Sequence, residues 1–428
     1  MSRSFELSLC ACGLLLLGLL SLHGDLLLLS LLLVVYLLAS YSFAPNEIQL
    51  KVERTLSSER VSVEMPVEVT LKITNAGPTL EEIQLIDPVP SNLRILKGSA
   101  RYIFFLGSGR SITVSYTVSG QRGYYPFHQV IVEVRDHFGL THRKTVIRTS
   151  GQLLVMPGVL RLSTIPIRTR RTRVYAGSIP ARVGGRGVEF FGVRQYQSGD
   201  PPRLINWRAS TRHAAVLYSN EYEQERVADV GIVLDGREKT NILGRGHSLF
   251  EHSVMACAAL ADALLSQGNR VGLLDYGRFL RWTIPGYGRI QRERILQALA
   301  NAETGSSVVF SDLEHIPVQL FPAHSQIILV SPLDVDDDQV LVQLRARGYQ
   351  VMVISPDPIT FEMGYLGADR SVRLAGRLAR LERAVLLNAL RRAGIQVLDW
   401  DVSQPFDQVV KKRLGHPPAY WRNVGVKV

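Results

Sequence analysis

Cysteine is scarce in this chain of 428 residues, with only three copies. Cys10 and Cys12 fall inside an apolar segment and Cys257 falls in a predicted helix, so neither a disulfide framework nor a thiol-rich metal site is indicated. The sequence also has no Gly-x-Ser-x-Gly motif, no zinc-binding helix motif and no phosphate-binding loop ending in Lys-Ser or Lys-Thr. We therefore expect a protein that is not an enzyme, in a compartment that is reducing or indifferent to disulfides.

Acidic residues are scarce between Arg161 and Arg212, within a chain whose net charge is +11. This stretch holds eleven arginines and two acids, Glu189 and Asp200, which gives it a net charge of +9. The planar guanidinium binds carboxylates and phosphates in bidentate fashion. The stretch is either a basic linker neutralised by acidic surfaces of the same protein or a basic docking surface. In the second case it would bind anionic lipid or polymer in a salt-dependent way, and no specific nucleic acid is indicated.

Long apolar runs occur at the N-terminus. Leu7–Leu22 and Leu26–Phe43 contain 16 and 18 residues and are separated by His23-Gly24-Asp25. Such lengths are just sufficient for a hydrocarbon core of about 30 Å. They predict a two-helix membrane hairpin over residues 1–43, and a cleavable signal peptide is the competing interpretation of the first run.

Charges beside these runs predict their orientation. The turn between them holds one aspartate, whereas the outer flanks hold basic residues, namely Arg3, Lys51, Arg54 and Arg60. Because cations are retained on the cytoplasmic side, we expect a two-pass protein of the cell membrane with residues 44–428 in the cytoplasm.

Residues 44–156 change to short runs with alternating polarity. Val61–Met65 and Val67–Ile73 have the period of two that is typical of a strand with one buried face. Asn75-Ala76-Gly77-Pro78 is typical of a turn. Further strands are predicted at Ile83–Ile86, Tyr102–Leu106, Ser111–Val118, Val130–Arg135 and Lys144–Arg148. This spacing predicts an antiparallel, Ig-like β-sandwich.

Residues 227–402 alternate strands with helices, after a basic linker and motif segment at 157–226. Strands are predicted at Val230–Leu234, Arg270–Leu274, Gln326–Val330, Gln350–Ile354 and Ile395–Leu398. Helices are predicted at His247–Gln267, Arg289–Ala302, Val335–Arg347 and Ser371–Arg392. This order predicts a Rossmann-like, doubly wound α/β domain with Arg278–Ile284 as an antiparallel edge strand. Residues 403–428 are expected to form a C-terminal tail.

The first strand of this domain ends at Asp235, where ligands of doubly wound folds bind. It resembles the start of a von Willebrand factor A (vWA) domain, in which Asp-x-Ser-x-Ser holds Mg²⁺ through oxygen atoms. Here the three positions are Asp235, Arg237 and Lys239. Two cations replace two hydroxyls, so we expect a degenerate, metal-free site in which Arg237 or Lys239 pairs with Asp235.

The later strand that completes a vWA metal shell is also altered. Pro332 lies near the position of the usual carboxylate, and Asp334 could replace it only if the loop bends back. Thr240, Thr304 and Ser307 are the remaining candidate oxygen ligands, and Asp275 is expected to be a turn or cap residue. No cofactor is therefore expected, with Mg²⁺ as the alternative. A metal-dependent adhesion domain or hydrolase is the weakest functional hypothesis.

A dense motif of glycine, charged and aromatic residues precedes this domain. Its members are Gly187, Glu189, Phe190, Arg194, Tyr196, Gly199, Asp200, Arg203 and Trp207, followed by Arg208. The pattern resembles the family catalogued as domain of unknown function 58, although Asn206 stands where that family has Asp. The resemblance implies a prokaryotic membrane protein with a vWA-like domain. It also implies a partner, a MoxR-type AAA+ ATPase, in the assembly or maturation of protein complexes.

Two roles are open for this motif. Its opposite charges could form a buried or half-buried ion-pair network that fixes the segment against the α/β sheet. Alternatively, Trp207 and the arginines could anchor a partner protein, because these residue types dominate interface energetics. The functional hypothesis that follows is a non-enzymatic, membrane-anchored adaptor or scaffold, whose client and oligomeric state the sequence does not indicate.

Overall fold

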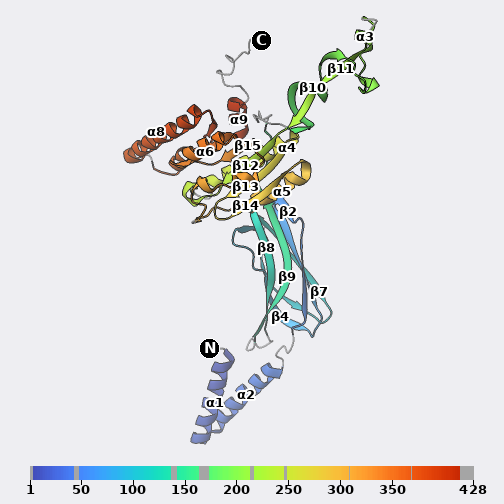
Figure 1. Cartoon of the computed structure of the whole chain (residues 1–428). Helices are drawn as coiled ribbons and strands as arrows, with labels where there is room; N and C mark the ends of the chain where they lie inside the picture. Colours follow the sequence, from blue (N-terminus) through green and yellow to red (C-terminus); the bar gives the residue numbers. More distant parts are fainter. Residues whose placement is uncertain are drawn as a thin grey trace. The chain divides into compact units, whose positions relative to one another are not determined.

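The computed structural model describes residues 3–42, 48–135, 142–162, 173–212, 216–244, 248–307, 309–367 and 369–414 (Figure 1). The chain divides into two compact units, Met1–Met156 and Pro157–Val428. The division falls where the predicted β-sandwich was expected to end.

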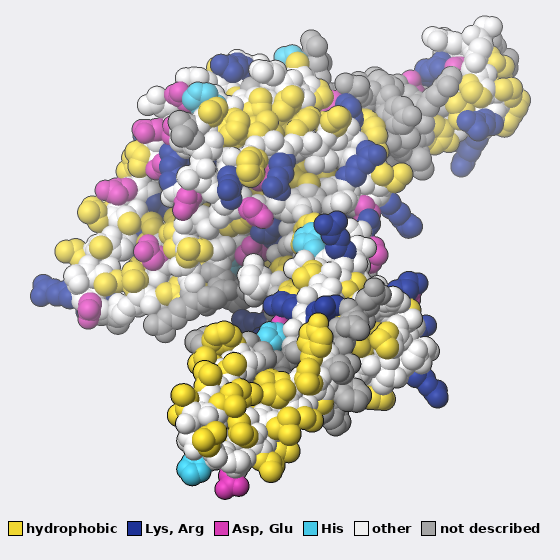
Figure 2. Space-filling model, turned by 90° about the horizontal axis from the view of Figure 1, so that it is seen from below, with side chains coloured by type: hydrophobic (Ala, Val, Ile, Leu, Met, Phe, Trp, Pro, Cys, Tyr) yellow, Lys and Arg dark blue, Asp and Glu magenta, His cyan; other side chains and the backbone are white. Residues whose placement is uncertain are grey.

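The N-terminal runs form two packed helices, α1 (Arg3–Ser21) and α2 (Gly24–Ser42). They approach closely at Gly18, where an added Cβ would lie 2.9 Å from the side chain of Leu27. Hydrophobic side chains cover the pair, which is nearest the viewer in Figure 2. The window Gly24–Tyr41 has a mean hydropathy of 2.0 and is long enough to cross a membrane, whereas Phe5–Ser21 is a shorter apolar helix. Two such helices are consistent with membrane anchoring.

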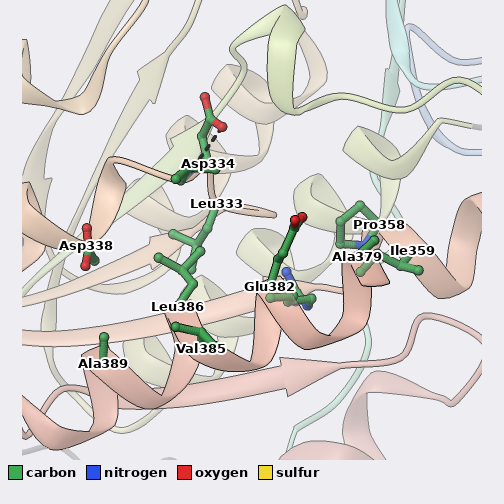
Figure 3. A pocket seen from close by; sticks show the side chains of 12 residues that line it. Leu333, Asp334, Asp338, Pro358, Ile359, Ala379, Glu382, Val385, Leu386 and Ala389 are labelled. Carbon is green, nitrogen blue, oxygen red and sulfur yellow. Dashed lines mark hydrogen bonds between the residues drawn. The ribbon is translucent and has the colours of Figure 1, made fainter. Parts of the chain in front are cut away.

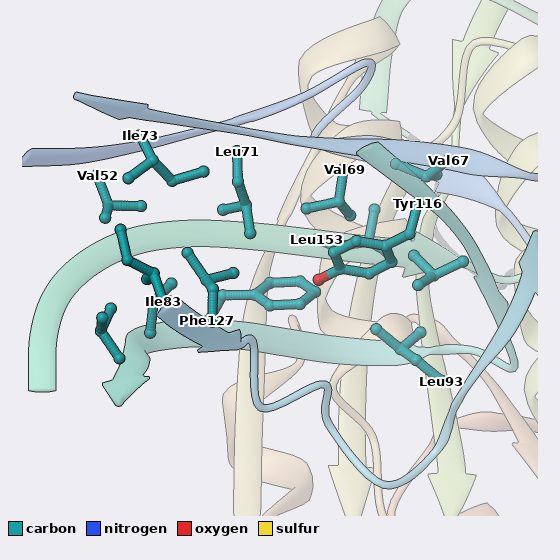
Figure 4. Close-up of a cluster of buried hydrophobic side chains, with 14 of the residues drawn as sticks. Val52, Val67, Val69, Leu71, Ile73, Ile83, Leu93, Tyr116, Phe127 and Leu153 are labelled. Carbon is teal, nitrogen blue, oxygen red and sulfur yellow. The ribbon is translucent and has the colours of Figure 1, made fainter. Parts of the chain in front are cut away.

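The β-rich part of the first unit consists of two sheets that enclose one core (Figure 4). The four-stranded sheet has the order β1 (Leu50–Leu56), β3 (Val67–Asn75), β7 (Ser111–Gly120) and β5 (Leu93–Lys97). The five-stranded sheet has the order β2 (Arg60–Ser62), β9 (His142–Met156), β8 (Gly123–Arg135), β4 (Leu80–Ile86) and β6 (Arg101–Leu106). Pairing is antiparallel except between β2 and β9. Alternate residues such as Val69 and Leu71 are fully buried, as the period of two predicts.

A buried ion pair joins the two sheets. Arg54 of β1 donates to Asp87, which follows β4, over 2.6 Å, and the side chains of both are fully buried. The Tyr116 hydroxyl of β7 donates to the other oxygen of Asp87, also over 2.6 Å, and burial raises the pKa of this tyrosine. Arg54 had been counted among the cations beside the membrane. Its charge is neutralised inside the β domain, so it adds nothing to that bias.

The second unit contains a six-stranded mixed sheet (Figure 1). Its order is β14 (Leu280–Gly286), β13 (Arg270–Tyr276), β12 (Asp229–Asp235), β15 (Gln326–Val330), β16 (Gln350–Pro356) and β17 (Gln396–Trp400). β14 is antiparallel to β13, and the other neighbours are parallel. The helices that accompany it are α4 (Leu249–Ser266), α5 (Gly288–Ala300), α6 (Asp337–Ala346), α7 (Pro358–Met363) and α8 (Arg370–Arg392). Each predicted strand and helix of this domain is present within a few residues of its expected limits.

One part of the second unit differs from expectation. Residues 406–414, assigned above to a tail, form α9 (Phe406–Leu414), in which Phe406 and Val410 are fully buried. Phe406 packs against Trp400 of β17, with ring centroids 4.6 Å apart, so the helix belongs to the α/β domain. Leu249–Ser266 is apolar enough to resemble a membrane span but is 72% buried, as a core helix should be.

The motif segment forms a separate pair of strands, β10 (Arg173–Gln195) and β11 (Tyr218–Val227). They pair antiparallel with several register shifts. A short helix, α3 (Trp207–Ser210), lies in the connection, and its N-cap is Asn206, whose side chain accepts a hydrogen bond from the backbone of Ala209. Asparagine is a favoured helix N-cap, which gives the residue at this position a local structural role.

Candidate functional site

Asp235 lies at the carboxyl end of β12, between the ends of β13 and β15. The strand order reverses here, which is the place where doubly wound sheets bind ligands. The turn that follows is tight, because an added Cβ on Gly277 would lie 2.6 Å from the backbone of Gly236. Asp235 itself is 2% exposed, so its carboxylate must be satisfied within the protein.

The Arg237 guanidinium supplies that partner. Its Nε and Nη2 donate to the two oxygens of Asp235 over 2.9 and 2.8 Å, and its backbone N–H adds a third bond over 3.0 Å. Of the two pairings expected with Asp235, the structure therefore has the one with Arg237. This arginine is 2% exposed, and the planar fork is bidentate, the strongest geometry for such a pair.

A second carboxylate, Asp337 of α6, holds the other side of the same guanidinium. Nη1 and Nη2 of Arg237 donate to its two oxygens over 3.0 and 2.7 Å. Burial raises the pKa of the Asp337 carboxyl, although hydrogen bonds from Arg237 act in the opposite direction. Burial lowers the pKa of Arg237, but the hydrogen bonds and charges of Asp235 and then Asp337 outweigh it and raise the pKa overall. The guanidinium thus remains charged between two acids.

Sequence reasoning missed Asp337. In the sequence, Asp337 stands in the run Asp336-Asp337-Asp338 at the start of a predicted helix. Acids are common there because of the helix dipole alone, so the run did not indicate a partner for Asp235 or Arg237. The residues considered instead were Pro332 and Asp334. In the structure, Ser331 donates to Asp235 over 2.6 Å, and the backbone N–H of Asp334 donates to Asp337 over 2.7 Å.

Lys239 does not join Asp235. It forms a bridge over 2.8 Å to Asp312 and another over 2.8 Å to Asp334, and about 40% of its side chain is exposed. Leu333 has a φ of +69°, which is rare for a residue with a side chain, in the loop that carries Asp334. Lys239 therefore ties two loops together at the rim of the site.

The other proposed oxygen ligands are placed differently. The Thr240 hydroxyl lies 3.3 Å from Asp235 and 3.0 Å from the carbonyl of Arg237, so it belongs to the cluster. Ser307 accepts a hydrogen bond from the backbone of Phe310. Thr304 immediately precedes Gly305, and Gly305 pairs with Arg237 in an isolated β-bridge. Asp275, expected in a turn, is instead a buried residue within β13.

Chemically, the cluster is a cation held by two carboxylates, with the hydroxyls of Ser331 and Thr240 donating to one of them, Asp235. Four guanidinium N–H groups are directed at Asp235 and Asp337. Across the described part of the chain, no three His, Cys, Asp or Glu side chains gather in a way that could hold a metal ion. Arg237 thus occupies the position between the acids, and we interpret it as a tethered substitute for a metal ion. That the protein binds no metal stays a prediction.

The motif residues gather around Asp200. Arg194 donates to one of its oxygens over 2.7 Å, and the backbone N–H of Gln197 donates to the other over 2.9 Å. Both bonds lower the pKa of Asp200, and the bond from Arg194 has the larger effect. Tyr196 donates to the Asp200 carbonyl over 3.1 Å, and Arg194 also lies 3.5 Å from Glu221 of β11. The ion pairs are half-buried and join residues within the β10–β11 segment.

The remaining motif residues are exposed. Trp207 is 65% and Phe190 61% exposed, and Arg203 and Arg208 lie at the surface. Gly199 has a φ of +106°, a conformation that suits glycine in the turn before Asp200. The side chain of Glu189 lies outside the described side chains. The structure therefore separates the motif into an internal part around Asp200 and an outward part that includes Trp207.

Residues 192–355 match the family model described as "Protein of unknown function DUF58". The chain carries a DUF58 domain. The match begins inside β10 and ends in β16, so the DUF58 domain includes Arg194, Asp200 and Trp207 together with the whole Asp235–Arg237–Asp337 cluster. It excludes Gly187, Glu189 and Phe190, which precede it.

No curated protein matches this DUF58-containing chain. Among solved structures, the CARDB domain of a Pyrococcus furiosus protein is 15% identical, with 25% of this chain and 93% of that one covered and a TM-score of 0.19. A FixG-related protein from Vibrio parahaemolyticus is 9% identical over 26% of this chain and 98% of that one, with a TM-score of 0.18. A non-cellulosomal cohesin from Archaeoglobus fulgidus is 15% identical, with 25% of this chain and 90% of that one covered and a TM-score of 0.17. TM-scores this low do not place the chain in the fold of any of them.

A groove of about 660 Å³ adjoins the cluster (Figure 3). One wall is the loop with Leu333 and Asp334, inside the DUF58 match, and the other is α8, which lies beyond it. Leu386 of α8 lies below Leu333 in Figure 3, and Asp338 and Glu382 add carboxylates at the sides. The groove has the apolar lining and few polar groups that are typical of a binding site.

Proposed function

We propose that this protein is a membrane-anchored adaptor without enzymatic activity, whose vWA-like α/β domain binds another protein. The observation that carries the proposal is the position of Arg237 between Asp235 and Asp337. In a metal-dependent vWA domain that position belongs to an ion with an open coordination site, which the partner fills. Here the guanidinium is already bound on both sides, so recognition must use the surrounding surface.

The same geometry argues against hydrolysis. A general base must reach a proton of the substrate, and a metal must hold an activated water molecule. Both carboxylates of the cluster are buried and engaged by Arg237. The one buried thiol of the described residues, Cys257, has a pKa raised by its burial, which disfavours the nucleophilic thiolate.

The partner that we propose is a cytoplasmic AAA+ ATPase of the MoxR type. This choice rests on the resemblance of the motif and of the domain order to the DUF58 family. The composition of the exposed part of the motif supports this choice, because an exposed tryptophan close in sequence to Arg203 and Arg208 is typical of an interface anchor. The apolar pair α1–α2 supports a position at the membrane.

Co-purification tests the proposal. A tagged full-length chain, extracted in mild detergent, is expected to retain a MoxR-type ATPase, identified by mass spectrometry. Trp207→Ala is expected to reduce the retained ATPase at least tenfold, as loss of about 2 kcal/mol at an interface anchor implies. Ile290→Ala is the matched control, because Ile290 is 71% exposed but lies on α5, away from the motif sequence. Equal recovery from both variants, or no ATPase with the unaltered chain, would refute the proposal.

A further inference from the structure

Helix α8 exposes a continuous aliphatic stripe. Leu374, Leu378, Leu381 and Val385 are 67%, 59%, 66% and 70% exposed. Their spacing of four, three and four residues places them on one face of the helix. Four large aliphatic side chains in one row are unusual on a surface that meets only water, because single exposed residues are normal but contiguous patches mark an interaction site.

The opposite face of α8 is fixed to the α/β domain, so the stripe cannot turn inward. Leu387 and Leu390 are buried, and an added Cβ on Gly376 would lie 2.5 Å from the sulfur of Met363. Arg383 on this face donates to the carbonyl of Pro332 over 2.9 Å and to Asp399 over 2.8 Å. Position 383 is separated from the stripe by about half a helical turn. Helix α8 therefore has two apolar faces, one packed against the domain and one exposed.

A row of arginines runs beside the stripe. Arg373, Arg377 and Arg380 are exposed, and each immediately precedes one leucine of the stripe. Neighbouring residues of a helix are separated by about 100°, so the three arginine positions lie on one flank of the stripe, where Arg380 donates to the sulfur of Met363 over 3.4 Å. Glu382 lies on the other flank, at the groove. The whole helix holds seven arginines and one glutamate, a net charge of +6.

We propose that α8 binds the surface of an anionic lipid bilayer. In this arrangement Leu374, Leu378, Leu381 and Val385 enter the boundary between headgroups and acyl chains, while the arginine row meets lipid phosphates. A leucine face next to an arginine flank is typical of helices that lie in the membrane interface. The inference rests on the membrane anchoring in the proposed function, because the hairpin α1–α2 would hold α8 near one bilayer at high effective concentration.

Charge decides between the occupants of this face. A second copy of α8 would bring its own row of exposed arginines to a distance of about 8–10 Å, and like charges at that separation repel. An anionic bilayer instead offers opposite charge over an area of any size. Binding to a bilayer also requires no complementary shape, which suits the stripe because it is a simple convex row. Tilting the helix toward its arginine flank keeps Glu382 away from the phosphates.

Lipid quenching of a fluorophore tests the inference on the full-length chain. In a Cys10→Ser/Cys12→Ser background the remaining native thiol, Cys257, is fully buried, so Leu378→Cys carries the label in vesicles of phosphatidylcholine with or without phosphatidylglycerol. Nitroxide-bearing lipids are expected to quench Leu378→Cys when phosphatidylglycerol is present. Arg373→Gln/Arg377→Gln should lower the equilibrium constant for the surface-bound state roughly 30-fold, since each arginine near an anionic surface contributes about 1 kcal/mol.

Two further label sites separate the inference from the proposed function. Leu28→Cys on α2 reports insertion of the hairpin, and Ile290→Cys on α5 is the control for an exposed apolar position of the α/β domain. Quenching at Leu28 and Leu378 but not at Ile290 supports the inference. Quenching at Leu28 alone overturns it and leaves the anchoring intact, whereas no quenching at Leu28 refutes the anchoring as well. If the label at position 378 is shielded from aqueous iodide but is not quenched by nitroxide lipids, then protein covers the stripe. That outcome would also overturn the inference.

Discussion

Arg237 and Asp337 lie one hundred residues apart in the sequence and are joined by two hydrogen bonds of 3.0 and 2.7 Å. With Asp235 on its other side, the guanidinium is the single cation between two buried carboxylates. The β12–α4 connection and the start of α6 are thereby fixed to each other. The stability of this edge of the sheet depends on one side chain.

Loss of that side chain should be costly. We expect Arg237→Met to lower the free energy of unfolding by about 3–5 kcal/mol, because it leaves buried charges without a partner. Urea denaturation at neutral pH measures the change. Lys239→Met is the control, since an exposed bridge contributes about 1 kcal/mol or less. Equal effects of the two substitutions would contradict a buried, structural role for Arg237.

A hydroxyl in place of the guanidinium should restore metal binding. Arg237→Ser recreates the Asp-x-Ser spacing and vacates the space between Asp235 and Asp337, with Ser331 nearby as a further oxygen. Hard divalent cations prefer such oxygen ligands. Calorimetry with Mg²⁺ and Mn²⁺ is expected to give a binding signal for Arg237→Ser that Asp235→Ala abolishes, and none for the unaltered chain. Binding by the unaltered chain that depends on Asp235 would refute the idea of a tethered cation.

The Lys239 bridge should respond to acid. The hydrogen bond from Lys239 is the main cause that lowers the pKa of Asp334 below its ordinary value of 3.8. The unfolded chain therefore takes up this proton first, so the stabilisation is present above pH 3.8 and is lost as pH falls through the lowered pKa. Lys239→Gln should reduce stability slightly at neutral pH and have no effect at the acid end. Denaturant titrations of both proteins over this range check it, and a difference that persists or grows in acid would contradict it.

The β domain should depend on Arg54 in the same way. Its guanidinium donates to Asp87 and, over 2.6 Å, to the carbonyl of Thr149. We expect Asp87→Asn to cost about 3–5 kcal/mol of unfolding free energy, because the buried arginine loses its counter-charge. Glu53→Gln is the control, since its bridge to Lys51 is exposed. Thermal unfolding in detergent, followed by the signal of the β domain, compares the two. A loss for Asp87→Asn no larger than for Glu53→Gln would show that the ion pair is not needed.

Periodicity predicted the elements of the fold well, because it depends on local spacing. Five strands of the α/β sheet were visible as apolar runs and the sixth was expected as an edge strand, and Asp235 was visible at the end of the first. Contacts over long sequence distances were not visible. Asp337 had no spacing relation to Arg237, and Asp87 had none to Arg54. The helix α9 was missed because it is short and its cations, Lys411 to Arg413, equal its buried residues in number, which weakens the amphipathic pattern.

The guanidinium of Arg237 has one consequence for how this protein is controlled. A bound ion leaves when its concentration falls, and with it leaves any contact that it supports. An arginine side chain is part of the chain and keeps its charge at every physiological pH. We therefore expect this edge of the sheet to be complete once the protein has folded, and to be insensitive to chelators and to the supply of divalent ions. Under the proposed function, the timing of capture and release would then be set by the partner.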